Sequence, residues 1–207
     1  MSCTELVTLI KDLILSGAAI AGAVIAIKGL STWKRQLKGQ SEYELSRRLL
    51  VTLFKYRDAI AGVRHPVMWA YEMPSPPEDE SKNMSREHIR FYGTSKAYQA
   101  RWDKVQAERA SLYADLLESE AIWGDELKKL FKTLFNLEHE LFTSVRHYVE
   151  LINPETKEGS KESIRDIDKK RRDIMYDDLS EEGDDYRKDF QLGVEAIERY
   201  LKPKLHY

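Results

Sequence analysis

Cysteine is almost missing from this chain of 207 residues, which has Cys3 and no other. A single cysteine excludes an intrachain disulfide and any metal site built from several thiolates. We therefore expect a reducing compartment, and we predict that Cys3 serves neither as a catalytic nucleophile nor as a lipidation site.

Strand-like alternation of useful length is also missing, and the six prolines and ten glycines are clustered instead of spread. Clustered breakers separate a few long elements, and the charged fraction of 33% suits helices with long solvated faces. The length allows one ordinary domain plus an appendage. The sequence therefore predicts an all-α protein.

Motifs for catalysis and cofactor binding are missing too. The chain has no phosphate-binding loop, dinucleotide fingerprint or nucleophile elbow, which argues against an NTPase or a hydrolase. It has no Glu-x-x-His pair of the kind that di-iron bundles need. His139 and His147 lie about two turns apart on one helical face, so a metal there would need ligands from another helix. We expect no catalytic residue, no metal site and no cofactor.

A long apolar run stands near the N-terminus. Residues 13–27 read LILSGAAIAGAVIAI, and residues 6–10 and 29–30 extend the run to roughly 25 residues if Lys11 and Lys28 reach toward head groups. Asp12 is costly there unless it lies at the interface or is paired. A secretory signal is disfavoured because no basic region precedes the run. A buried core helix is the stronger of these two alternatives. We nevertheless predict a transmembrane helix.

The residues that follow the run support this prediction. Trp33 lies among Lys34, Arg35 and Lys38, the composition of a cytoplasmic membrane boundary. Residues 28–64 carry nine Lys/Arg and three Asp/Glu, whereas the rest of the chain is acidic. We expect residues 1–40 to be a membrane anchor with a basic juxtamembrane segment in the inner (cytoplasmic) membrane, with the C-terminal domain in the cytoplasm.

Small residues recur within the predicted span. Ala18, Gly22 and Ala26 are four residues apart, so they share a face on which another helix could pack closely. This spacing predicts a homo-oligomer. The alternative is that alanine and glycine are simply common in membrane helices.

Residues 41–207 are predicted to form a helical cytoplasmic domain. Ser41 and Glu44 fit a capping box that opens an amphipathic helix after a break at Gly39-Gln40, ending before Pro66. Its basic face carries Arg47, Arg48, Lys55, Arg57 and Arg64, and this face is expected to contact the lipids of the membrane surface. A solvated face is the plain alternative, and nucleic acid ranks lower because no recognised binding motif accompanies the charges.

The remaining chain predicts four or five cytoplasmic helices in a bundle. A Pro/acidic loop is expected near residues 65–84, with Trp69, Tyr71 and Met73 packed on the bundle. Helices are predicted from Ser85 to about Glu120, and from Gly124-Asp125 to Asn153, the two packing antiparallel. A polar loop is expected over residues 157–163, then a helix carrying Ile164, Ile167 and Ile174. A last helix is expected from about Asp184 to Pro203.

One resemblance adds to this interpretation. The resemblance rests on two segments, STWKRQLKGQSEYELSRRLL and the following KYRDAIAGVRHP. They resemble a recurring arrangement in small, uncharacterised bacterial and phage proteins with an N-terminal membrane helix and a helical cytoplasmic domain. It covers roughly residues 6–66 and implies topology and setting, with no site residues.

Together these patterns predict a single-pass membrane protein that acts as an oligomeric scaffold, a sensor or a membrane effector, the last including effectors of bacterial defence. Its partners would be membrane lipids, further copies of the chain and an unknown protein. Two alternatives stay open: a soluble helical oligomer with a buried N-terminal helix, and, less favoured, an enzyme with a site between helices.

Overall fold

The computed structural model describes residues 3–205, and their side chains except at residues 3–10, 12, 13 and 19. The helices are α1 (Cys3–Arg64), α2 (Glu78–Ser81), α3 (Arg86–Trp123), α4 (Glu126–Ile152), α5 (Glu158–Asp168) and α6 (Asp185–Leu201), with 3-10 turns η1 (Ala70–Glu72) and η2 (Lys202–Leu205). No strand occurs in residues 3–205, so the all-α prediction is confirmed for them. The predictions for the side chains of Cys3 and Asp12 lie outside the described residues.

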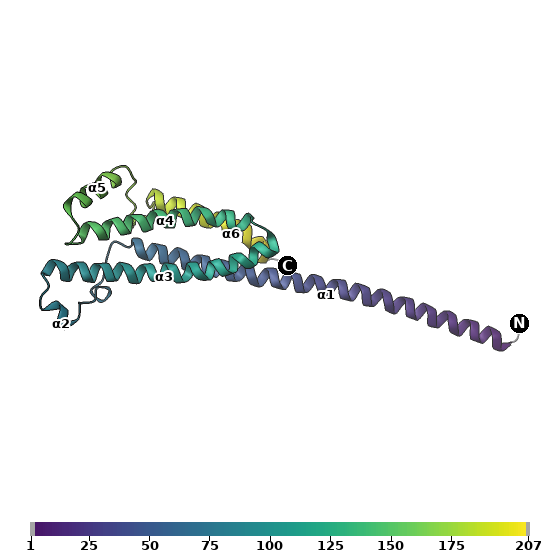
Figure 1. The fold of residues 1–207 in the computed structure, drawn as a ribbon. Helices are drawn as coiled ribbons and strands as arrows, with labels where there is room; N and C mark the ends of the chain where they lie inside the picture. Colours follow the sequence, from purple (N-terminus) through teal and green to yellow (C-terminus); the bar gives the residue numbers. More distant parts are fainter. Residues whose placement is uncertain (1–2, 206–207) are drawn as a thin grey trace.

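Helix α1 is a single rod of 62 residues, about 90 Å long at 1.5 Å per residue. Its N-terminal part extends far beyond the other helices (Figure 1). The predicted break at Gly39-Gln40, with a capping box at Ser41, is wrong. Side-chain pairs four residues apart bridge the position: Lys38 to Glu42 at 3.8 Å, and the Gln40 amide donating to Glu44 at 3.0 Å.

The C-terminal part of α1 forms a four-helix bundle with α3, α4 and α6 (Figure 1). Apolar residues three and four positions apart on α1 are buried in its core: Leu45, Leu49, Leu53, Tyr56, Ile60 and Val63. Each of the other three helices adds a stripe of the same period. The core therefore lies entirely within the bundle part of the molecule.

Helices α3 and α4 form the predicted antiparallel hairpin. Ser85 caps α3 by accepting a hydrogen bond from the His88 backbone N–H, and Gly124 ends it with a φ of 78°. A left-handed residue at this place favours glycine, because a Cβ would be strained there. Contacts between the helices, including the ring pair of Tyr98 and Tyr148 at 5.6 Å, confirm the antiparallel packing.

The segment between α4 and α6 differs from the prediction. Residues 158–168 form α5 where a polar loop was expected to extend to residue 163, and the helix ends before Ile174. Ile174 is nevertheless buried, because it lies in an irregular segment held against the end of α1. The apolar residue was correctly recognised, but its secondary structure was not.

Arg64 was predicted on the exposed basic face, but it is buried, because its guanidinium holds that irregular segment. Its guanidinium donates to the backbone oxygens of Ile174 and Tyr176, both at 2.8 Å, and to the carboxylates of Asp177 at 3.3 Å and Asp184 at 2.5 Å. Burial alone would raise the pKa of Asp184, but hydrogen bonds from Arg64 and from two backbone N–H groups lower it overall. A buried arginine thus replaces regular structure as the link between α1 and this segment.

The Pro/acidic loop is held in a similar way. Arg101 of α3 donates to the backbone oxygens of His65 at 2.9 Å and Val67 at 2.8 Å, and to Glu72 at 2.8 and 2.9 Å. The prediction that Trp69 and Tyr71 pack on the bundle is wrong, since both rings are exposed. Polar contacts to Arg101 hold this segment where apolar packing was expected.

Candidate membrane anchor

The apolar part of α1 extends from the bundle without a covering surface. We call residues 14–38 the projecting segment; all its described side chains are exposed, as Ile25 is at 71%. The stretch has a mean hydropathy of 1.8 over an 18-residue window, none of which is buried. By length and composition this part of α1 is therefore able to cross a membrane, and the rest of the described chain does not bury it.

Its dimensions can be compared with those of a bilayer. Residues 13–27, the uncharged run, form 15 residues of helix, or about 22 Å at 1.5 Å per residue, with Lys11 and Lys28 near its two ends. A hydrocarbon core is about 30 Å thick, and lysine side chains at both ends can extend to the head groups. The apolar length is thus adequate for a span with modest local adjustment.

The flank next to the bundle carries only positive charge. Trp33, Lys34, Arg35 and Lys38 are all exposed, and residues 14–38 contain no Asp or Glu. The next acidic residue along α1 after this segment is Glu42, which pairs with Lys38. An aromatic side chain among cations on an otherwise unbroken helix suits a bilayer interface.

The three small residues predicted to form a helix–helix interface also lie on the projecting segment. Ala18, Gly22 and Ala26 are exposed, and a Cβ at Gly22 would meet no atom within 4 Å. This face is therefore open in the single chain, and nothing in the bundle closes it.

Arg47 and Arg48, the other predicted membrane-surface residues, lie where α1 joins the bundle. Arg47 is exposed, whereas the guanidinium of Arg48 contacts Asp115 at 3.2 Å and Glu118 of α3. Two carboxylates already offset its charge, so Arg48 has little to offer an anionic surface. Arg47 is thus exposed, as Lys34, Arg35 and Lys38 are, whereas Arg48 is held by carboxylates of α3.

The bundle end nearest the projecting segment contains cations that the sequence did not connect with it. The α3–α4 turn and η2 both lie there (Figure 1). Lys204 of η2 places its ammonium 4.6 Å from the Trp123 ring centre and 4.9 Å from that of Tyr200, a cation–π arrangement. The predicted hairpin turn indicated that residues near 124 lie at one end of the bundle. No signal in the sequence indicated that η2 lies at the same end.

The two histidines considered as metal ligands, His139 and His147, lie in different surroundings. His139 is exposed, while His147 contacts Asp168 at 2.7 Å, and the two do not share a site. Within the described part of the chain, no three His, Cys, Asp or Glu side chains are grouped to suit a metal ion. The buried Glu138 is occupied by hydrogen bonds from Tyr56 and Arg109, both at 2.6 Å.

That buried network is structural. Burial, then the charge of Glu138, raises the pKa of Tyr56 far above its ordinary value, so the phenol stays a hydrogen-bond donor. Glu138 is thereby satisfied within the core of the bundle.

Comparisons of the chain with protein-family models, with curated proteins and with solved structures found no match.

Proposed function

We propose that this protein is a single-pass membrane protein of the inner membrane, whose projecting segment spans the bilayer and whose bundle works in the cytoplasm as an oligomeric scaffold, sensor or membrane effector. One observation carries the proposal. The apolar side chains of the projecting segment have no neighbour in the bundle, yet the helix continues from them into the bundle core without a break.

Water is a poor environment for this segment. Large apolar side chains stand exposed along it: Ile14, Leu15, Ile20, Val24, Ile25, Ile27 and Leu30. Burying each is worth about 1.5–3 kcal/mol relative to full exposure. Something outside the chain must therefore cover them.

A bilayer suits the segment better than a soluble oligomer does. Residues 13–27 contain Ser16 as their one polar side chain, so the helix is apolar around its whole circumference. A helix in a soluble coiled coil keeps a polar face toward water, whereas a membrane span has none. The alternative of a soluble oligomer would leave the outer face of every copy exposed.

The continuous helix supports a role for the bundle that depends on the anchor. Nine positions separate Leu30 from Gly39, which is already buried, so the bundle begins about 14 Å beyond the apolar stretch. A helix without a hinge passes rotation or tilt of its span to the bundle. Association of anchors through Ala18, Gly22 and Ala26 would thereby bring bundles together for an unidentified protein partner.

Membrane fractionation tests the anchor. Ile20→Arg with Val24→Arg places two charges in the span, at a cost of roughly 5–7 kcal/mol for a centred pair. We expect wild type to stay in the membrane pellet after a carbonate wash and the double variant to move to the supernatant. Leu192→Arg, at an exposed position on α6, is the control that stays in the pellet. Wild-type protein in the supernatant would overturn the anchor.

Cys3 allows a test of orientation, because it is the chain's own single thiol. In spheroplasts, a membrane-impermeant maleimide should label wild type. It should fail to label a Cys3→Ser, Ser160→Cys variant, whose thiol stands on the exposed surface of α5. The reverse pattern would place the bundle outside and contradict the proposed location.

The effector form of the proposal has its own measurement. On overexpression we expect a membrane-potential dye to report depolarisation, and Gly22→Leu to abolish it because the bulky side chain blocks close approach of anchors. Cell-wide crosslinking should show oligomers of wild type and fewer of Gly22→Leu. An intact membrane potential together with crosslinked oligomers would contradict the effector role and leave the scaffold and sensor roles. Crosslinking that yields only monomers would contradict self-association.

A further inference from the structure

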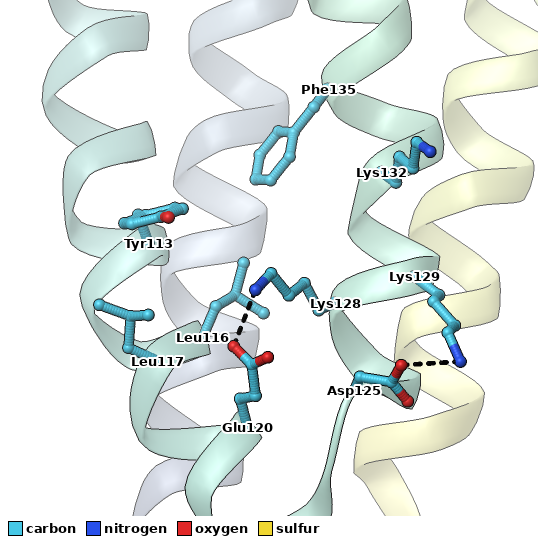
Figure 2. Close-up of a pocket in the computed structure, with 9 residues that line it drawn as sticks. All are labelled: Tyr113, Leu116, Leu117, Glu120, Asp125, Lys128, Lys129, Lys132 and Phe135. Carbon is cyan, nitrogen blue, oxygen red and sulfur yellow. Dashed lines mark hydrogen bonds and ion pairs between the residues drawn. The ribbon is translucent and has the colours of Figure 1, made fainter.

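A cavity of about 390 Å³ lies between α3 and α4 at the bundle end nearest the projecting segment. Tyr113, Leu116 and Leu117 of α3 form one wall, and Phe135 of α4 reaches toward them from the other (Figure 2). Pockets that hold small ligands begin at about 300 Å³ and are lined mainly by apolar side chains. The cavity therefore suits a short hydrocarbon or aromatic body.

Its apolar wall is unusually open for a bundle surface. The side chains of Tyr113 and Leu117 are each about half exposed, at 52% and 51%. Both stand at the mouth, while Leu116 is buried behind them. An apolar ligand would cover side chains that the bundle itself leaves in water.

Cations line the rim on α4. Lys128 extends across the cavity end to Glu120 of α3 at 2.8 Å, and Lys129 turns back to Asp125 at 2.8 Å (Figure 2). Lys132 also lines the cavity, and it has no carboxylate partner among the described residues. One positive charge at the mouth is thus left for a ligand.

The position of these lysines is unfavourable for α4 alone. Lys128 and Lys129 stand in the first turns of a helix that begins at Glu126, where the positive end of the helix dipole disfavours cations. Departures from such local rules are expected where a sequence serves a function instead of stability. Glu120 and Asp125 offset these two charges within the protein, so Lys132, further along α4, is the lysine of this mouth that is left for an anion.

We propose that this cavity binds an apolar acid, a hydrocarbon or aromatic body bearing one anionic group, with the body against Leu117 and Phe135 and the anionic group on Lys132. The inference does not rest on the membrane anchor, because every residue that forms the cavity belongs to α3, α4 and the turn between them. The ligand could come from free acids in water or from anionic lipid.

Photolabelling distinguishes these sources on the full chain in phosphatidylcholine nanodiscs. One arm adds a free medium-chain fatty acid bearing a diazirine; the other carries the same chain in phosphatidylglycerol within the disc. Label on peptides containing residues 113–117 or 132–135 supports the site and identifies its source by arm. Label confined to residues 14–30 in both arms overturns the cavity, and it leaves the membrane anchor standing.

Matched variants test the recognition. Lys132→Glu should lower cavity labelling by the free acid about tenfold, the loss of one hydrogen bond to a charged group, and Lys132→Arg should retain it. Lys55→Glu, at an exposed position on α1, should leave labelling unchanged. The uncharged alcohol analogue should label wild type as weakly as the acid labels Lys132→Glu. Equal labelling by acid and alcohol would overturn the anion site.

The apolar half of the cavity has a separate variant. Leu117→Glu adds a carboxylate at a half-exposed position, so the bundle should fold with an unchanged urea unfolding curve while cavity labelling is lost. Labelling that persists in folded Leu117→Glu would contradict binding against this wall.

Discussion

The two parts of α1 carry similar apolar side chains in opposite surroundings. Leu49 and Ile60 are buried in the bundle, while Ile20 and Ile25 are exposed along the projecting segment. Residues 45–64 keep a charged face opposite the apolar one, whereas residues 13–27 are apolar on every side. The distribution of apolar side chains around the helix, more than their number, determines which part joins a bundle.

The largest contrast should come from arginines at the two ends of the bundle part of α1. Arg64→Ala leaves Asp184 and the backbone oxygens of residues 174 and 176 without their donor, so we expect a loss of about 3–5 kcal/mol in the free energy of unfolding. Arg47→Ala, at an exposed position, should change it by less than about 0.5 kcal/mol. Urea unfolding followed by tryptophan fluorescence measures both. Equal losses would show that the Arg64 contacts do not hold the segment.

Leucine truncations sharpen the comparison directly. Leu49→Ala opens a void in the core and should cost about 2–5 kcal/mol. Leu30→Ala, on the projecting segment, should leave the bundle's unfolding curve unchanged because its side chain touches nothing there. A destabilised bundle in Leu30→Ala would mean that the projecting segment folds back onto it.

Glycines provide a third pair. A Cβ at Gly193 would lie 2.5 Å from Cδ2 of Leu134, so Gly193→Ala should push α6 from α4 and cost about 1–3 kcal/mol. Gly22→Ala has free space around it and should preserve or slightly strengthen the helix. Thermal unfolding in nanodiscs compares them. An unaffected Gly193→Ala variant would show that Leu134 moves aside freely.

The smallest effect should appear with pH. Hydrogen bonds from Arg101, its largest influence, lower the pKa of Glu72 from 4.5 to about 2. The folded state therefore gains stability above pH 4.5 and loses it as the pH falls toward 2. Glu72→Gln should be less stable than wild type at neutral pH and show a shallower decline over this range in urea unfolding. Residues 14–38 have no acidic group and should not contribute. Parallel declines would remove Glu72 as the cause.

Local patterns were reliable wherever a helix end had a clear chemical cause. Ser85 at the start of α3, Gly124 after it and Asp184 before α6 were all recognised, because caps and breakers act within a few residues. The same reasoning failed at Gly39-Gln40. There a weak breaker was overruled by side-chain pairs across it and by packing of the following turns.

The irregular segments could not be predicted from apolar spacing. Ile174 reads as part of a helical stripe, but its burial depends on Arg64, which is 110 residues away in the chain. The spacing of Trp69 and Tyr71 predicts rings packed on the bundle, but Arg101 holds their loop by polar contacts that leave the rings in solvent. A buried guanidinium that binds several backbone oxygens leaves no periodic trace in the sequence.

Local sequence patterns sufficed for the all-helical class, the antiparallel hairpin and the apolar N-terminal stretch, since each depends on residues near one another in the chain. The absence of any cover for that stretch, the pairing of Arg48 with α3 and the cavity rimmed by Lys132 became visible only in the folded molecule. These features depend on which helices pack together and on how far each helix is shifted along its neighbour. That is decided by packing between residues far apart in sequence, whose partners no local pattern identifies.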